Sequence, residues 1–488
     1  MPGGILQLIN NNQHNEYISG NPQITFFKSV FKKYTNFAIE CIDQSLEGDL
    51  SLGNIIECKI DKYYGDLLHD MYLEIELKLT LDSTYNYYSI INYCYNIIDY
   101  VEIEIGNTII DKHYGKWMQI WNELTEDNTL GFNGLVSLYT SDNEHISENG
   151  IYHTSLLTKS QQMSGNGIHK ILKNAHENIS NQSSDNSSQK YFNMNYRNYG
   201  GGNTFYEEDN MLKGRIFIPF NFWFCNKPGL AIPLLCLFYD DIHIRIKLNE
   251  DKNIKLDSNY TENSTIYSND TNYSFSDSYI HNNGVLTDDS NIITDISNYK
   301  LWCEYIYIDE DEKSKFVNSN HLYLIEQLQY QQNTINHNNG LIQNEKIDLR
   351  FNHTIKELIW TFQRNNPLYE TELLSPLNYD GDIEIFINEH SRFEKQNIFY
   401  FTRYQPYRYH TGRGGINHND SIYVYSFSLF PEKFQPSGIC NFDNINVSLL
   451  LNNISILCDN DSFNINIYAI NYNILQFSGG SVKLLYGK

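Results

Sequence analysis

The 488-residue chain has no cysteine pattern that indicates disulfides or metal binding. Its eight cysteines stand singly, without a CxxC pair and without a cysteine–histidine cluster at the spacing of zinc ligands. Isolated cysteines of this kind are typical of reduced core thiols in a protein made in a cytosol-like compartment. The pattern therefore excludes a disulfide-stapled scaffold and a zinc module.

Long apolar runs and an N-terminal leader are also missing. The longest clean apolar stretch runs from Leu230 to Phe238, whereas a bilayer-spanning helix needs about 20 apolar residues. The opening residues, MPGGILQLINNNQHNEY, do not have the basic start and sustained apolar core of a signal peptide. We therefore expect a chain that is neither exported through a signal peptide nor anchored in a membrane.

Positive charge is scarce. Lys and Arg together number 35 against 59 Asp and Glu, which gives a formal net charge of −24. A surface this acidic repels phosphate backbones and argues against bulk nucleic-acid binding. The length exceeds what one compact core usually holds, so we expect two domains.

One segment, from Gly20 to Glu40, departs from this acidity. It mixes three lysines with aromatic rings, at Phe26, Phe27, Lys28, Phe31, Lys32, Lys33 and Tyr34. Rings and cations in such a mixture are typical of proteins that bind single-stranded nucleic acid. The acidic remainder of the chain favours a second interpretation, in which the rings make apolar packing contacts and the lysines bind acidic partners.

No sequence signature of catalysis is present. The chain has no P-loop, no HExxH zinc motif and no GxSxG nucleophile elbow. Glu102 and Glu104 have the residue type of a glycosidase pair, but they alternate with apolar residues and are expected on the solvent face of a strand. We predict no catalytic residue, no cofactor and no metal ligand.

What the chain does have is alternation of apolar and polar residues with a period of two. The pattern predicts strands over residues 71–81, 101–110 and 241–248, with Gly106-Asn107 as a hairpin turn. Helical periodicity is confined to short pieces such as residues 116–124. Many short antiparallel strands with little helix predict an all-β protein built from sandwiches or jelly rolls.

Two Asn- and Ser-rich segments interrupt the strand pattern. They cover about residues 141–208 and 249–298, and neither has enough apolar residues to form a domain of its own. We interpret the first as long surface loops within a β-domain. The second is expected to be the junction between two domains.

Five blocks, in this order, resemble the conserved blocks of the major capsid proteins of nucleocytoplasmic large DNA viruses. They are GNPQITFFKSVFKKYTNFAIE, DYVEIEIGNTIIDKHYGKWMQIWNELT, PFNFWFCNKPGLAIPLLCLFYDDIHIRI, LWCEYIYIDEDEKSKF with HLYLIEQLQ, and VYSFSLFPEKFQPSGICNF. Their collinear order makes the resemblance far more specific than any one block. It implies a double jelly roll, two consecutive eight-stranded antiparallel jelly rolls with long surface loops and a few short helices. It also implies a structural protein that is not an enzyme.

On this basis the chain divides into four parts. They are an N-terminal arm (1–23), a first jelly roll (24–248), an Asn/Ser-rich junction or loop (249–298) and a second jelly roll (299–488). The loops within 141–208 are expected on the exposed top of the capsomer, where this family carries its variable loops.

The resemblance also implies partners and a location. Three copies form a pseudo-hexagonal homotrimeric capsomer, and capsomers tile the icosahedral shell of the virion after synthesis in the host cytoplasm. Further expected partners are minor capsid proteins, penton proteins and the surface of the underlying viral membrane. Because that membrane separates the shell from the genome, no direct contact with nucleic acid is expected. The seven residues of the basic aromatic segment, Phe26 to Tyr34, are the candidates for assembly contacts.

Departures from the family pattern keep alternatives open. The family commonly continues after QPSG-x-CNF with a run like Ser-Arg-Ile-Asp-Asn, whereas Asp443-Asn444-Ile445-Asn446 follows Phe442 here. The chain is therefore either the principal shell protein or a paralogous minor capsid protein of the same fold. A carbohydrate- or receptor-binding β-sandwich is the next alternative, and a glycosidase is the third.

Overall fold

The computed structural model describes most of the chain outside the long loops. It covers residues 5, 19–49, 51–80, 89–90, 95, 97–125, 138–139, 206–208, 211–249, 293–337, 340–365, 374, 376, 380–411, 421–456 and 462–487. The loops predicted within 141–208 and most of the 249–298 segment lie outside the described residues. The chain forms two compact units, residues 1–37 and 38–488, so the arm predicted for residues 1–23 extends to Phe37.

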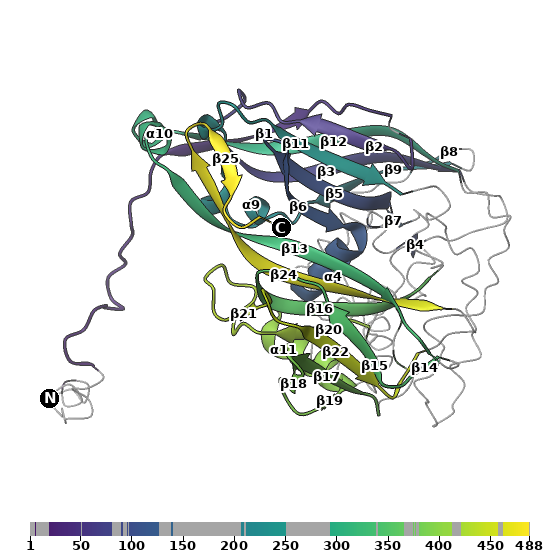
Figure 1. Ribbon diagram of the computed structural model, residues 1–488. Helices are drawn as coiled ribbons and strands as arrows, with labels where there is room; N and C mark the ends of the chain where they lie inside the picture. The colour runs from purple at the N-terminus through teal and green to yellow at the C-terminus, as the bar shows by residue number, and fades with distance from the viewer. Residues whose placement is uncertain are drawn as a thin grey trace. The chain divides into compact units, whose positions relative to one another are not determined.

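The first half of the body is a sandwich of two sheets (Figure 1). One sheet has the strand order β1-β12-β3-β9-β8 and the other has the order β2-β11-β5-β6. Their bounds are β1 Phe37–Gln44, β2 Ile55–Lys59, β3 Leu67–Thr80, β5 Ile98–Ile105, β6 Thr108–Tyr114, β8 Tyr206–Glu208, β9 Met211–Pro219, β11 Ile242–Leu248 and β12 Ile293–Ile308. The strands predicted from alternation are confirmed, and β11 alternates buried and half-buried residues along its whole length.

The second half is a sandwich of the same kind. Its sheets have the orders β13-β24-β16-β20 and β15-β22-β17-β18. Their bounds are β13 His321–Thr334, β15 Glu345–Leu349, β16 Thr354–Arg364, β17 Asp382–Ile387, β18 His390–Ser391, β20 Tyr423–Ser426, β22 Val447–Asn452 and β24 Phe463–Ser478.

Short elements complete the described part of the fold. The remaining strands are β4 Ser89–Ile90, β7 Leu138–Tyr139, β10 Ile232–Pro233, β14 Leu341–Ile342, β19 Gln396–Asn397, β21 Cys440–Asn441, β23 Ile454–Ser455 and β25 Ser481–Leu484. The helices are α4 Gly115–Thr125, α9 Trp223–Asn226, α10 Glu310–Val317 and α11 Gln405–Tyr409, with short η2 Pro228–Leu230, η3 Leu234–Cys236 and η6 Tyr400–Tyr404. The helix predicted over residues 116–124 is confirmed as α4.

The two sandwiches share one strand order. In each, eight described strands can be numbered along the chain, namely β1, β2, β3, β5, β6, β9, β11 and β12, and then β13, β15, β16, β17, β18, β20, β22 and β24. In both sets the first strand pairs with the eighth, the eighth with the third and the third with the sixth, while the other sheet runs second, seventh, fourth, fifth. This is the order of a jelly roll, so the body is two jelly rolls in tandem.

The structure corrects the predicted boundary between the rolls. Strand β12 pairs with β3 from Ile293 to Ile306, so it is the eighth strand of the first roll and not the first strand of the second. The Asn- and Ser-rich segment before it is therefore a connection inside the first roll. The boundary was misplaced because a long polar loop and an interdomain linker have the same composition. Pairing between β12 and β3 is a long-range contact, which composition does not reveal.

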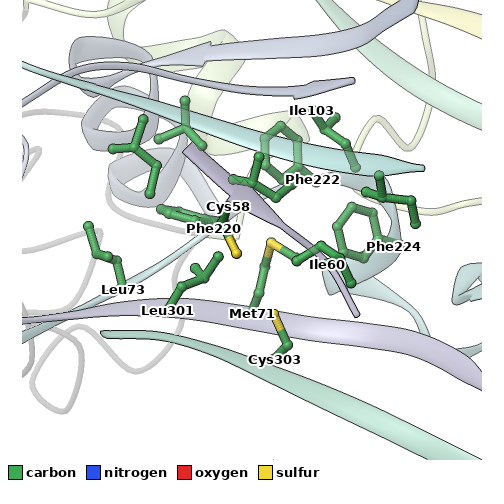
Figure 2. Packing of buried hydrophobic residues seen from close by; sticks show 14 of the residues in the cluster. Cys58, Ile60, Met71, Leu73, Ile103, Phe220, Phe222, Phe224, Leu301 and Cys303 are labelled. Atoms are coloured by element: carbon green, nitrogen blue, oxygen red, sulfur yellow. The ribbon is translucent and has the colours of Figure 1, made fainter. Parts of the chain in front are cut away.

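Two large apolar cores are centred one in each roll, and the first also includes Ile325, Leu475 and Phe477 of the second roll. In the first core, the sulfur-bearing side chains of Cys58, Met71 and Cys303 lie close together between strands β2, β3 and β12 (Figure 2). Burial raises the pKa of the Cys303 thiol well above its usual value, which keeps it protonated and unreactive. The six cysteines that the structure describes are free thiols, in agreement with the sequence-based expectation of reduced cysteines.

A third apolar cluster joins the two rolls. Helix α4 of the first roll packs on the sheet of the second roll that contains β24, through a cluster of Trp117, Ile120, Leu124, Leu328, Ile359, Ile422, Val424, Tyr468 and Ile470. The ring centroids of Trp117 and Tyr468 are 5.2 Å apart. Beside them, the carboxylate of Asp111 accepts a 3.0 Å hydrogen bond from the backbone N–H of Leu328. The rings supply buried area, and the hydrogen bond fixes how the rolls align.

A buried charge cluster lies next to this contact. His410, which follows α11, bonds to Glu357 on β16 at 2.9 Å and to Glu432 at 3.0 Å. The buried ammonium of Lys356 pairs with Glu326 at 2.6 Å and donates to the carbonyl of Pro431 at 2.8 Å. The cluster therefore ties the segment around Pro431 and Glu432, which lies between β20 and β21, to strand β16.

Replacing Trp117 with alanine tests the contact between the rolls. The side chain is 3% exposed, and removing a fully buried Trp typically costs about 3–5 kcal/mol of the free energy of unfolding. Urea denaturation of Trp117→Ala should show a loss of that size. The control is Tyr63→Ala, which removes a ring that is 95% exposed and should change stability by less than about 0.5 kcal/mol. Equal losses in both variants would contradict the packing described.

The charge cluster predicts a pH dependence of stability. Burial alone lowers the pKa of His410, but the carboxylates of Glu357 and Glu432 outweigh it and raise the pKa to about 9. A raised pKa means that the stabilisation is complete below the unfolded value of about 6.5 and is lost as pH rises through 9. Thermal unfolding between pH 6 and 10 should therefore show a steeper decline for the wild type than for His410→Gln. The exposed-site variant His390→Gln should follow the wild type, and matching slopes for all three proteins would refute the prediction.

Candidate assembly site

The structure places the seven predicted assembly residues in the N-terminal arm. Residues 21–36 form no helix or strand, and a local turn is marked by a 3.3 Å hydrogen bond from the Phe27 N–H to the hydroxyl of Thr25. All of the rings are exposed, with Phe27 the most exposed at 98%. Tyr34 packs on Phe37, with ring centroids 6.1 Å apart.

Exposed rings next to lysines make the arm a candidate contact segment. Side chains at Phe26, Phe31, Lys32 and Lys33 are exposed as well, so the arm offers apolar surface and positive charge together. Exposed apolar groups that lie close together mark interaction sites more often than single exposed rings do. The assembly role of these residues stays a prediction.

A second apolar surface was not predicted from the sequence. Residues 429–439, between β20 and β21, expose the side chains of Leu429, Phe430, Phe434 and Ile439. The sequence does carry a signal, because consecutive apolar residues are followed by Pro431, Pro436 and Gly438 and do not alternate as in a strand. We call this surface, together with Lys433 and the adjacent Lys227, the loop patch.

The backbone of the loop patch is held by hydrogen bonds from within the loop. Ser437 is the central residue, since its hydroxyl accepts from the Phe430 N–H at 2.9 Å and bonds to the Ser428 hydroxyl at 2.6 Å. Gly438 has a φ of +152°, and a Cβ there would lie 2.4 Å from the carbonyl oxygen of Phe427. Only glycine fits this close approach of two backbone segments. The loop therefore has one defined conformation.

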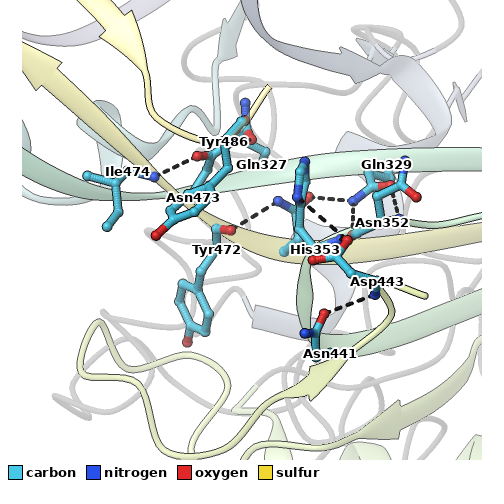
Figure 3. A network of polar contacts seen from close by, with 11 residues as sticks. Gln327, Gln329, Asn352, His353, Asn441, Asp443, Tyr472, Asn473, Ile474 and Tyr486 are labelled. Carbon is cyan, nitrogen blue, oxygen red and sulfur yellow. Dashed lines mark hydrogen bonds and ion pairs between the residues drawn. The ribbon is translucent and has the colours of Figure 1, made fainter. Parts of the chain in front are cut away.

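Polar contacts also fix the end of the loop (Figure 3). Strand β21 pairs with β16, and after it the Asp443 carboxylate accepts a 2.8 Å hydrogen bond from the backbone N–H of His353. His353 has a φ of 67°, a conformation that a non-glycine residue adopts only when its surroundings hold it. The Asp443 carboxylate supplies that support here.

The loop patch joins apolar rings to cations from both jelly rolls. The ammonium of Lys433 lies 4.5 Å from the ring centroid of Phe430, and that of Lys227 lies 4.7 Å from the ring centroid of Phe434. Lys227 stands between α9 and η2 of the first roll. The patch therefore contains residues of both rolls, and its two lysines stand beside one carboxylate, that of Glu432, which is paired with His410.

The candidate glycosidase pair has a structural role instead. Glu102 is 7% exposed, so the expectation that it lies on a solvent face is wrong. Arg245 on the neighbouring strand β11 pairs with Glu102 at 3.6 Å and with Glu104, and the hydrogen bond to Glu104 raises the pKa of the guanidinium. Both carboxylates are thus held as partners of one arginine, which does not suit a proton donor.

Searches for a metal or membrane site give no candidate. Within the described residues, His, Cys, Asp and Glu side chains form no group of three or more that is arranged to hold a metal ion. In the same part of the chain, no helix is long and apolar enough to cross a membrane.

Sequence comparisons identify the family. The model of the family described as "Major capsid protein N-terminus" matches residues 25–309, and that of "Large eukaryotic DNA virus major capsid protein" matches residues 312–482. Their boundary falls at α10, where the first roll ends. The major capsid protein of Pyramimonas orientalis virus is 29% identical, and that of Paramecium bursaria Chlorella virus 1 is 27% identical, each over 100% of both chains.

Solved structures show the same fold. PBCV-1 VP54, in a crystal structure fitted into a reconstruction of the virophage Sputnik, aligns with a TM-score of 0.63 and 24% identity over 95% of this chain and 100% of that one. The Faustovirus major capsid protein aligns with a TM-score of 0.61 and 11% identity, over 96% of this chain and 94% of that one. The chain thus belongs to the family of major capsid proteins of large eukaryotic DNA viruses, and its fold is the double jelly roll.

Proposed function

We propose that this chain forms homotrimeric, pseudo-hexagonal capsomers that tile the outer icosahedral shell of a large DNA virus. The observation that carries the proposal is the repeated strand order, first–eighth–third–sixth and second–seventh–fourth–fifth, in both rolls. One chain thereby contains two similar sandwiches. Three chains around a threefold axis then present six similar units, which is the symmetry that hexagonal packing needs.

The contact between the rolls gives this arrangement its rigidity. A capsomer keeps a hexagonal outline only if the two rolls of each chain hold a fixed mutual orientation. The cluster around Trp117 and the Asp111–Leu328 hydrogen bond provide that orientation. Within the trimer we expect large, partly apolar interfaces, and between capsomers smaller and more polar ones that tolerate changes in angle across the shell.

The proposed partners follow from the same role. The chain contacts two further copies in its trimer, then neighbouring capsomers, minor capsid proteins and penton proteins. The basic aromatic arm, through Lys28, Lys32 and Lys33, binds acidic neighbours, minor capsid proteins or the underlying membrane surface. A net charge of −24 suits a shell that does not touch the genome. The chain is made in the host cytoplasm and acts without catalysis or a cofactor.

The first test is the mass of the purified protein. Three chains of 57.2 kDa give a particle of about 170 kDa. Light scattering at micromolar concentration should report that mass, and negative-stain images should show hexagonal outlines. If the protein remains a monomer at micromolar concentration, the proposal is contradicted.

The second test concerns the arm. Replacing Lys28, Lys32 and Lys33 with glutamate should leave the trimer intact and reduce incorporation of the chain into virions at least tenfold, because the arm then repels acidic partners. The ratio of variant to wild-type chain in purified particles, measured by mass spectrometry after co-expression during infection, gives the result.

A charge-matched control separates the arm from net charge. Lys315, Lys346 and Lys483 are exposed lysines of the body, and changing them to glutamate alters the net charge by the same amount. This control should be incorporated better than the arm variant. If the arm variant no longer forms trimers, the lysines belong to the interface between subunits and their proposed role is wrong.

A further inference from the structure

We propose that the loop patch, formed by Leu429, Phe430, Phe434, Ile439, Lys227 and Lys433, is a contact through which each chain binds the next copy in its trimer. The inference rests on the proposed homotrimer and names the surface that holds it together. A threefold ring requires a heterologous contact, in which one patch on a copy meets a different face of the next.

The composition of the loop patch is that of an interface centre. Four large apolar side chains are exposed within eleven consecutive residues, and Phe430 keeps 53% of its surface exposed. Aromatic rings are enriched at the cores of protein interfaces, and a few such anchors usually carry most of the binding energy. The exposed rings gain this energy when a partner covers them.

The loop patch is also preorganised. The hydroxyl of Ser437 holds the Phe430 backbone, and the close approach at Gly438 fixes the chain beyond it. Below the patch, Lys356 and His410 bind the Pro431 carbonyl and the Glu432 carboxylate. A surface that is already ordered loses little conformational entropy on binding. Three buried charged groups, Lys356, Glu357 and His410, hold this exposed apolar loop in place, an arrangement that a partner on the loop would explain.

Charge indicates that the partner is a second copy of this chain. In the loop patch the two lysines, Lys227 and Lys433, outnumber the one carboxylate of the loop, Glu432, which is paired with His410, while the chain as a whole carries −24. The remaining surface of another copy is therefore acidic on average, and it attracts the patch. Because the patch contains residues of both rolls, it also occupies the junction between them, where a neighbour would contact the two sandwiches at once.

Removing the two rings tests the proposal directly. In the full-length chain, Phe430→Ser with Phe434→Ser should weaken trimer formation at least tenfold, seen by sedimentation equilibrium as a shift from the trimer toward 57.2 kDa. Both rings are exposed, so the circular dichroism spectrum and the thermal unfolding of the subunit should match those of the wild type.

A matched control removes two other exposed rings. Phe238 and Tyr239 are also exposed and lie far from the loop patch in sequence. Their backbone N–H groups donate hydrogen bonds of 3.0 and 3.1 Å to the carbonyl oxygen of Gly480. Phe238→Ser with Tyr239→Ser should leave the trimer unchanged. If both double variants dissociate alike, the effect is loss of general apolar surface, and the assignment of the patch is overturned.

A second variant keeps the test decisive if the ring variant fails to fold. Lys227→Glu with Lys433→Glu leaves the rings in place and should also weaken the trimer at least tenfold, with a smaller effect at high salt. If the wild type is a trimer and both patch variants form the trimer equally well, the inference is overturned and the proposed function stands. A wild type that is monomeric would overturn the proposed function itself.

Discussion

The packing of helix α4 on the sheet that contains β24 sets how the two jelly rolls are placed against each other. Together with Ile325, Leu475 and Phe477, which the second roll adds to the first core, it joins the two jelly rolls into one compact unit. As a result, strand β24 of this sheet is buried along most of its length, on both faces. Ile465, Ile467 and Ala469 of β24 point into the second core, while Tyr468 and Ile470 contact α4. A strand buried on both faces loses the alternation of an ordinary sandwich strand.

Ion pairs explain how buried charges are tolerated near the junction of the rolls. Each buried cation has a carboxylate partner within hydrogen-bonding distance, Lys356 with Glu326 and His410 with Glu357 and Glu432. Such pairs contribute little net stability compared with apolar packing. They fix geometry instead, because an unpaired charge at this depth is very costly. Here the geometry that they fix is that of the loop patch.

Two surfaces of this chain have similar chemistry but different backbone structure. The arm carries rings and lysines on backbone without helix or strand between residues 21 and 36, whereas the loop patch carries rings and lysines on backbone that hydrogen bonds hold. An ordered surface suits a permanent contact of one geometry, and an extended segment suits contacts that vary between positions. This difference is why the loop patch is assigned to the trimer and the arm to the shell.

Residue patterns alone predicted the all-β class, the strands at 71–81, 101–110 and 241–248, helix α4 and the reduced thiols, and five collinear blocks predicted the family. These are local patterns, or residues that the family's blocks share. Strand pairing and packing were needed to show that β12 closes the first roll and that Glu102 is buried beside Arg245. The packed structure also showed that Leu429, Phe430, Phe434 and Ile439 are exposed on a loop that hydrogen bonds of its own hold. Each of these depends on which distant strand lies alongside, and a period of two residues carries no information about that partner.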